Sequence, residues 1–136
     1  MLLELFGPYV APLVLHVVGD YTTQSDWVAQ NKTKSWWPAF VPAPVYTAPF
    51  ALITLSGHAL YFIWATHYLI DRWRLARYIC WVKNFLAPRS AWPPEWKECQ
   101  PTGYSPSVPT YLSLWLMIVT DNTMHVICNA IALRFL

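Results

Sequence analysis

The sequence has few charged residues and little cysteine. Only 12% of its 136 residues are charged, about half the usual share for a soluble domain, and the net charge is +2. Such a small net charge does not predict a basic surface for binding nucleic acid, so nucleic acid is not an expected partner. The three cysteines, Cys80, Cys99 and Cys128, include no C-x-x-C pair, so neither a disulfide framework nor a thiolate zinc site is indicated. We interpret them as packing thiols.

Lysine, arginine, aspartate and glutamate are all absent from Ala39 to Ile70. A helix over this run would be about 48 Å long, too long for one crossing of a bilayer core of about 30 Å. The run therefore predicts two helices, broken near Ser56–Gly57. A mean hydropathy of only +0.29 leaves a soluble, ligand-filled helical bundle as the second interpretation.

The whole pattern predicts one all-α, membrane-embedded domain over residues 1–136, with about four transmembrane helices and one amphipathic interfacial helix. The N-terminal residues carry Glu4 and no basic stretch, so we expect a retained first helix and no typical signal peptide. The expected elements are a helix from about Pro12, a polar connection over 25–38, two helices over 39–70, a basic interfacial helix continuing after Asp71, a proline-rich loop over 88–109 and a last helix over 111–136.

Basic residues are concentrated on one side of this topology. Seven of the nine lie in the 21–38 connection or between Arg72 and Arg89. The positive-inside rule makes that side cytoplasmic and both termini external.

Three of the four histidines stand four residues from an aspartate. The pairs are His16 with Asp20, His67 with Asp71, and Asp121 with His125. In a helix this spacing puts both side chains on one face, about one turn apart. A single pair is well explained by a local hydrogen bond in a core. Three pairs in three apolar segments favour one shared site in the cytoplasmic half of the bundle.

These residue types are suited to a divalent metal. Neutral imidazole and carboxylate bind Zn²⁺, Mn²⁺ or Fe²⁺, and we expect zinc first. A catalytic ion would lower the pKa of its bound water towards about 7, with Asp20, Asp71 or Asp121 as general base. This chemistry predicts hydrolysis of a phosphoester or an amide near the lipid headgroups.

Four further residues have two interpretations each. Gln24 and Asn122 are either hydrogen-bonding supports behind the metal ligands or polar residues at helix ends. Arg74 and Arg77 either bind a substrate phosphate or pair with Asp71 and extend to lipid headgroups, and the second interpretation is favoured. His58 has no aspartate at this spacing and is not an expected ligand.

The sequence resembles a phage and bacterial family, the domain of unknown function 3307. The resemblance rests on H-x-x-x-D-x-x-x-Q-x-D-W-x-A-x-N-K at His16 to Lys32, T-H-Y-L-I-D at Thr66 to Asp71 and D-N-T-M-H at Asp121 to His125. It implies a small polytopic membrane protein, distantly similar to membrane-bound metal-dependent hydrolases. It also implies a further histidine where this chain has Pro42, and the change would weaken metal binding if that histidine is a ligand.

Two functions follow from these observations. The first is a metal-dependent hydrolase of a bacterial inner membrane, bacterial or phage-encoded, acting on a phospholipid or other phosphoester. The alternative is a non-enzymatic membrane protein whose polar cluster stabilises the bundle or binds a host partner. The substrate, the number of ions and the oligomeric state are not predicted.

Overall fold

The computed structural model describes residues 2–23 and 25–136, with only the backbone for residues 26 and 29. The described residues form helices and turns without a strand, which confirms the all-α prediction. The elements are α1 (Leu2–Val17), η1 (Val18–Thr22), α2 (Asp26–Asn31), α3 (Trp36–Phe40), α4 (Pro42–Thr47), η2 (Ala48–Leu52), α5 (Gly57–Trp73), α6 (Ala76–Lys83), η3 (Asn84–Leu86), η4 (Arg89–Ala91), α7 (Trp96–Cys99) and α8 (Thr110–Phe135).

The chain divides into two compact units. The first holds the residues up to Trp73 together with His125–Leu136, and the second holds Arg74–Met124. Both units contribute part of α8, because the boundary falls within this helix.

The first helix begins earlier than the sequence predicts and contains two irregularities. Gly7 has φ 70° and ψ 170°, so the backbone kinks there and the helix resumes at Pro8, whose fixed φ suits a first helical turn. At its C-terminal end, Val18–Thr22 forms a π-helical turn, η1. Such turns are rare in proteins overall, and those that occur are frequently at functional sites.

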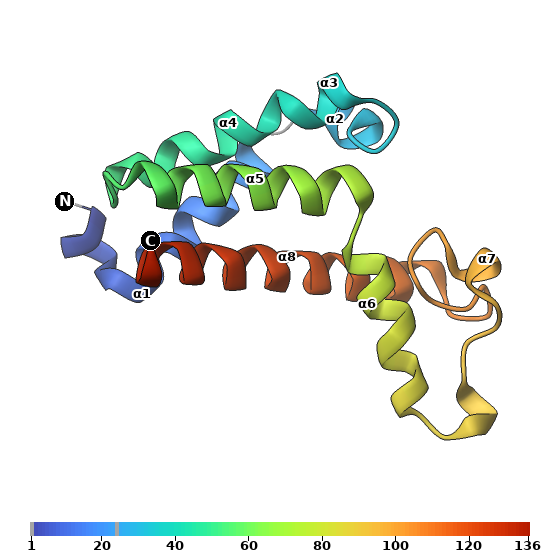
Figure 1. The fold of residues 1–136 in the computed structure, drawn as a ribbon. Helices are drawn as coiled ribbons and strands as arrows, with labels where there is room; N and C mark the ends of the chain where they lie inside the picture. The colour runs from blue at the N-terminus through green and yellow to red at the C-terminus, as the bar shows by residue number, and fades with distance from the viewer. Residues whose placement is uncertain (1, 24) are drawn as a thin grey trace. The chain divides into compact units, whose positions relative to one another are not determined.

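The charge-free run folds as predicted into two helical segments with a break. Its first part is short: α3, α4 and the 3₁₀ turn η2 follow one another, because Pro42 and Pro49 each start a new helical turn. The chain then turns, and α5 begins at Gly57. In Figure 1, α4 and α5 lie side by side.

The core of the first unit joins helices that are distant in sequence. Its buried residues come from α1, α4, η2, α5 and the last part of α8: Leu15, Tyr46, Phe50, Ala59, Ile63 and Ala132. Gly19 in η1 allows η1 and α4 to pack closely against each other. A Cβ atom there would lie 2.7 Å from Tyr46 Cδ2 and 3.3 Å from Tyr46 Cα.

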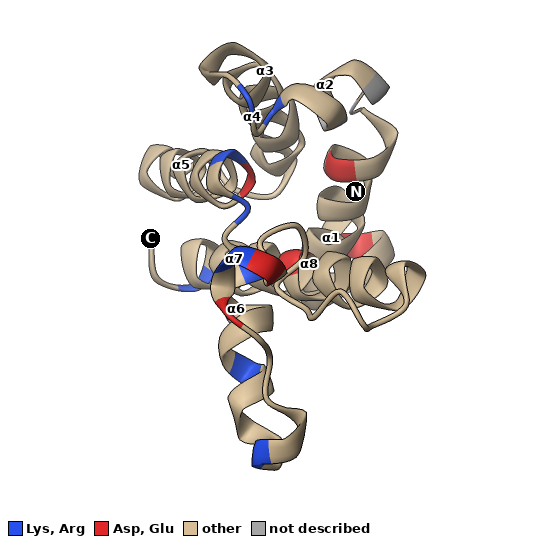
Figure 2. Cartoon of the chain, turned by 90° about the vertical axis from the view of Figure 1, so that its right-hand side faces the viewer, with Lys and Arg blue, Asp and Glu red and all other residues tan. Residues whose placement is uncertain are grey.

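The prediction that an interfacial helix continues α5 without a break is wrong at the start of that helix. The helix α5 ends at Trp73, and Arg74 adopts a left-handed conformation with φ 49°. Because this conformation is unfavourable for a residue with a side chain, it ends the helix, and α6 begins as a separate element of the second unit. Figure 2 shows the charged residues of α5 at its C-terminal end and basic residues on α6.

The proline-rich segment 88–109 is packed, although most of it is irregular as predicted. Gly103 has φ 82°, and a Cβ atom there would collide with the carbonyl of Arg77. Cys99 and Tyr104 are buried, and Tyr104 packs with Cys80 and Ala76 of α6. Burial, together with Glu98, raises the pKa of the Cys99 thiol, so Cys99 behaves as a packing thiol.

Two helical segments of the described chain are long and apolar enough to cross a bilayer. They are Leu2–Thr22 and Thr110–Phe135. The segments formed by α4, η2 and α5 are shorter and do not meet this criterion. The four-crossing arrangement is therefore not established by helix length and apolarity.

The Gly19–Tyr46 contact predicts a destabilising substitution. Gly19→Ala adds a methyl group that forces Tyr46 or η1 to move, and overpacking of this kind costs about 1–3 kcal/mol. The matched control is Gly57→Ala, because a Cβ atom at Gly57 meets no heavy atom within 4 Å. Thermal unfolding of both purified variants checks this, and equal stability would contradict the close packing.

Candidate metal centre

His16 and Asp20 lie on the first helix, but the π-helical turn changes their relation. His16 ends the α-helical part and Asp20 lies within η1. The distance from His16 Nδ1 to Asp20 Oδ2 is 3.8 Å, longer than a hydrogen bond. The same nitrogen is 2.9 Å from the Tyr46 hydroxyl and forms a hydrogen bond with it. His16 and Asp20 therefore remain an ion pair at 3.8 Å, while the hydrogen bond of His16 Nδ1 goes to Tyr46.

His67 and Asp71 form the predicted pair on α5. His67 Nε2 lies 3.3 Å from Asp71 Oδ2, and both side chains are buried. The Asp71 side chain is only 3% exposed. A carboxylate at this depth is costly unless positive charge or hydrogen-bond donors surround it.

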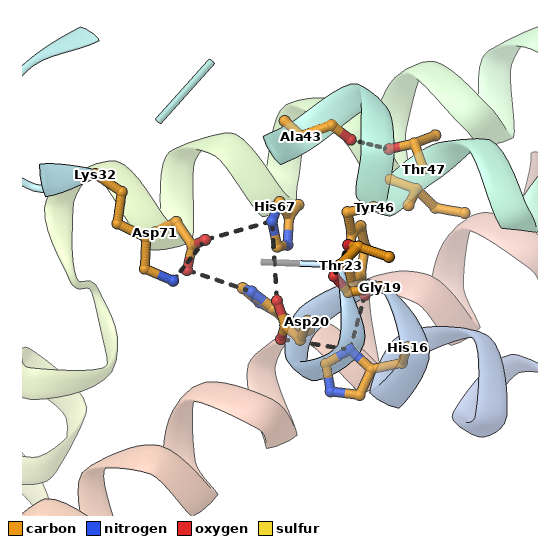
Figure 3. Close-up of polar contacts among 12 residues, drawn as sticks. His16, Gly19, Asp20, Thr23, Lys32, Ala43, Tyr46, Thr47, His67 and Asp71 are labelled. Atoms are coloured by element: carbon orange, nitrogen blue, oxygen red, sulfur yellow. Dashed lines mark hydrogen bonds and ion pairs between the residues drawn. The ribbon is translucent and has the colours of Figure 1, made fainter. Parts of the chain in front are cut away.

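Asp20 and His125 complete a four-residue cluster around this pair. His67 Nε2 is 4.0 Å from Asp20 Oδ1, and His125 Nε2 is 3.7 Å from Asp71 Oδ1. One ligand atom from each of Asp20, His67, Asp71 and His125 lies within 4.8 Å of the other three. Figure 3 shows Asp20, His67 and Asp71 directed towards one another. Three separate segments therefore bring two imidazoles and two carboxylates to one point.

Two predicted residues of α8 belong to the second unit. Asp121 and Asn122 both precede the boundary between Met124 and His125. The Asn122 amide donates a hydrogen bond of 2.9 Å to the carbonyl of Ile118 in its own helix. Their part in the metal centre stays a prediction.

Arg74 and Arg77 belong to the second unit, whereas the cluster belongs to the first. Arg74 is exposed, and Arg77 donates hydrogen bonds to the Gln100 carbonyl and the Tyr78 hydroxyl within the second unit. Gln24 lies outside the described residues. His58 is exposed at the start of α5, which agrees with its exclusion as a ligand.

Lys32 is a member of the site that spacing did not indicate. Its Nζ donates a 2.9 Å hydrogen bond to Asp71 Oδ2, and its side chain is 18% exposed. The next residue, Thr33, accepts a 2.6 Å hydrogen bond from Arg72 Nη1, which holds the loop after α2 against the end of α5. Because Lys32 is 39 residues from Asp71, no local pattern could have found this pair.

Tyr46 and Asn129 were also missed. The Tyr46 hydroxyl accepts a 2.6 Å hydrogen bond from Asn129 Nδ2 and is bonded to His16. The Tyr46 ring stacks on His67 with centroids 3.8 Å apart and an angle of 8° between the planes. The position of Asn129, one helical turn after His125, is the feature of the sequence that could have indicated its place in the site.

The charges of this cluster favour a cation. Burial disfavours the charged form of histidine, and a neutral imidazole is the form that binds metals. Asp20 and Asp71 bring two carboxylates to the same point, and Lys32 forms an ion pair with Asp71. The set of ligand types, imidazole nitrogen and carboxylate oxygen without thiolate, suits an open zinc, manganese or iron site.

The fold and the cluster define a class: a small helical protein with long apolar helices and a buried histidine–aspartate cluster. Within this class, the chain belongs to the family described as protein of unknown function DUF3307, whose model matches residues 9–100. The match includes His16, Asp20, Lys32, Tyr46, His67 and Asp71, and it ends before α8. Comparison with curated proteins and with solved structures finds no match.

The Lys32–Asp71 ion pair predicts a large effect of removing the lysine charge. Lys32→Met leaves a buried carboxylate without this partner, and breaking a buried pair from one side costs about 3–5 kcal/mol. The partial exposure of Lys32 places the expected loss at the lower end. Lys34→Met, at an exposed position in the same loop, should change stability little. Thermal unfolding in a chelator-containing buffer checks this, and equal effects of the two substitutions would contradict the assignment.

Proposed function

We propose that this protein is a membrane-embedded, metal-dependent hydrolase whose divalent ion is bound by Asp20, His67, Asp71 and His125. The observation that carries the proposal is the meeting of these four ligand atoms within 4.8 Å, on segments far apart in sequence. Two imidazoles and two carboxylates can supply four ligands, and zinc is the first expectation, with manganese or iron next.

The surroundings of the four ligands support defined roles. Asp20 is the most exposed of them, at 10%, which makes it the best-placed general base. Tyr46 holds His67 by ring stacking and His16 by a hydrogen bond, so it fixes the orientation of both rings. A divalent ion would act as a Lewis acid and lower the pKa of bound water towards about 7. Asp121 remains a further candidate base.

Exposed apolar side chains support a position in the membrane. In the first unit alone, large apolar residues of α1, α4, η2, α5 and α8 face outwards, among them Leu5, Val17, Val45, Leu52, Leu69 and Ile127. A soluble protein rarely exposes so large an apolar surface. Residues of α1, α4, η2, α5 and α8 pack into one core, and this shared packing supports four crossings.

The location follows from this topology and from the family. We propose the inner membrane of a bacterium, with a bacterial or a phage gene as the source. The distribution of basic residues supports a cytoplasmic location for the 25–38 loop and for the second unit's proline-rich segment. Both termini then face outwards.

A cavity beside the site indicates the kind of substrate. It has a volume of about 610 Å³ and lies between α1 and the last part of α8, with apolar walls from residues such as Pro12, Leu13 and Ile131. Asn129 lines it and also hydrogen-bonds Tyr46, so the cavity adjoins the metal centre. These walls suit the apolar chain of an amphiphile, which favours a phospholipid or another lipid-linked phosphoester.

The alternative is a non-enzymatic membrane protein whose polar cluster stabilises the bundle or binds a host partner. The observation in its favour is that protein groups already connect the cluster, through Lys32 with Asp71 and Asn129 with Tyr46 and His16. Under this function, isosteric changes such as Asp20→Asn would lower stability. Any loss of function would then follow from the loss of stability.

The metal proposal predicts stoichiometric divalent metal in the purified protein. His67→Gln and Asp71→Asn should lower bound metal sharply, since even changes behind the ligands cost about 10–100-fold in affinity. His125→Gln should do the same from another helix, whereas His58→Gln is the matched control. Elemental analysis for zinc, manganese and iron at matched folding provides the measurement.

A second measurement separates metal binding from a structural role. Zinc should stabilise Lys32→Met more than the parent, because the ion replaces the charge that the lysine supplied to Asp71. A folded parent that contains no transition metal and takes up none when it is supplied would refute the proposal.

The topology proposal predicts the location of three tags. A tag at Lys34 and a tag at Ser107 should both report the cytoplasm. A tag at Ser56, in the turn before α5, should report the outside if α4, η2 and α5 complete two further crossings. A cytoplasmic signal at Ser56 would leave only α1 and α8 as crossings, and opposite locations for Lys34 and Ser107 would contradict both arrangements.

A further inference from the structure

The helix α6 carries an exposed apolar stripe in addition to its buried face. Ala76 and Cys80 are buried against Tyr104 and Met117 of the same unit. On the other side, large apolar residues follow helical spacing into η3 and are exposed: Tyr78, Ile79, Val82, Phe85 and Leu86. Leu86 is 90% exposed. One short helix thus presents two apolar faces, and the residues that the structure describes bury only one of them.

Aromatic rings and cations border this stripe. The Arg77 guanidinium lies 5.1 Å from the centre of the Tyr78 ring and 5.6 Å from that of Trp96. Arg89 lies 5.4 Å from the centre of the Trp92 ring. Trp81 contacts Phe85, with ring centroids 4.9 Å apart. Aromatic residues next to arginine and lysine are typical of the boundary between headgroups and acyl chains.

The charge of the segment is of one sign. Residues 76–92 contain Arg77, Lys83 and Arg89 and no aspartate or glutamate. An exposed apolar stripe flanked by unbalanced cations complements the surface of an anionic bilayer. A second copy of this chain would bring the same cations together, which disfavours it as the occupant.

The direction and depth of α6 also fit a bilayer surface. Within the second unit, α6 runs across the first half of α8, not along it, in both views (Figures 1 and 2). If α8 crosses the membrane, α6 therefore lies along the membrane plane. The contacts of Cys80 and Lys83 with Thr120 fix its level on α8. Thr120 lies about 22 Å before Phe135 along α8, so counting a core of about 30 Å back from Phe135 places Thr120 about 7–8 Å inside the cytoplasmic boundary, within the usual depth of an interfacial helix, about 5–10 Å.

We propose that residues 76–92 form a membrane-surface arm that inserts Ile79, Val82 and Leu86 into the cytoplasmic leaflet and binds anionic lipid headgroups through Lys83 and Arg89. The arm would hold the second unit on the membrane surface. The proposal rests on the membrane crossing of α8 and is independent of metal binding and hydrolysis.

The test compares two single cysteine substitutions in the full-length protein, Leu86→Cys and Ser107→Cys. Ser107 is an exposed polar position of the same unit. Each variant is reconstituted in nanodiscs of phosphatidylglycerol and labelled with a membrane-impermeant maleimide, and the parent measures labelling of the native cysteines. We expect loss of labelling at position 86 in nanodiscs, its return in detergent, and full labelling at position 107 in both.

Two results would overturn the insertion. Labelling at position 86 in nanodiscs as fast as at position 107 would show that the stripe faces water. Protection at position 86 in both nanodiscs and detergent would show that a protein surface or a second copy covers it.

The lipid preference has its own measurement. Protection of position 86 should be weaker in phosphatidylcholine nanodiscs than in phosphatidylglycerol nanodiscs. Combining Leu86→Cys with Lys83→Gln and Arg89→Gln should remove this difference. Equal protection in both lipids before these changes would overturn the binding of anionic headgroups.

Discussion

The buried carboxylate of Asp71 is the constraint on which the first unit depends. A negative charge with 3% exposure in an apolar interior requires compensation, and three segments supply it. His67 comes from the same helix, His125 from α8, and Lys32 from the loop after α2. The contacts of His125 and Lys32 tie α5 to two other parts of the chain, so the polar centre organises the packing around it.

Tyr46 connects this centre to the apolar core. Its ring stacks on His67 while its hydroxyl bonds to His16 and Asn129, and the ring also belongs to the core formed with Phe50 and Ile63. This position is accessible only because Gly19 has no side chain. The π-helical turn that contains Gly19 also carries Asp20, so close packing and the placement of a candidate ligand have the same local cause.

The two proposed roles of the cluster make different demands on Lys32. In a purely structural cluster, the ammonium is a permanent partner of Asp71, and its loss only destabilises the fold. In a metal centre, the ammonium and the ion share the same carboxylate, so Lys32 limits how strongly an ion is held. If the histidine that the resemblance implies at position 42 is a ligand, Pro42 acts in the same direction, because proline supplies no ligand at the start of α4.

The sequence determined the features that depend on neighbours one turn apart or on composition. The absence of charge from Ala39 to Ile70 predicted two apolar helices with a break before Gly57, and helical periodicity predicted the contact of His67 with Asp71. The motifs from His16 to Asp71 indicated the family through residue types and their spacing alone.

Only the tertiary structure decided which helix faces meet. His125 lies beside Asp71, whereas Asp121, its partner by spacing, falls in the other unit. Lys32 reaches Asp71 across 39 residues and Asn129 reaches Tyr46 across 83. Periodicity fixes a residue's position around its own helix, but the π-helical turn and the close approach at Gly19 set how the end of α1 meets α4. That arrangement depends on packing between distant segments, which no local pattern contains.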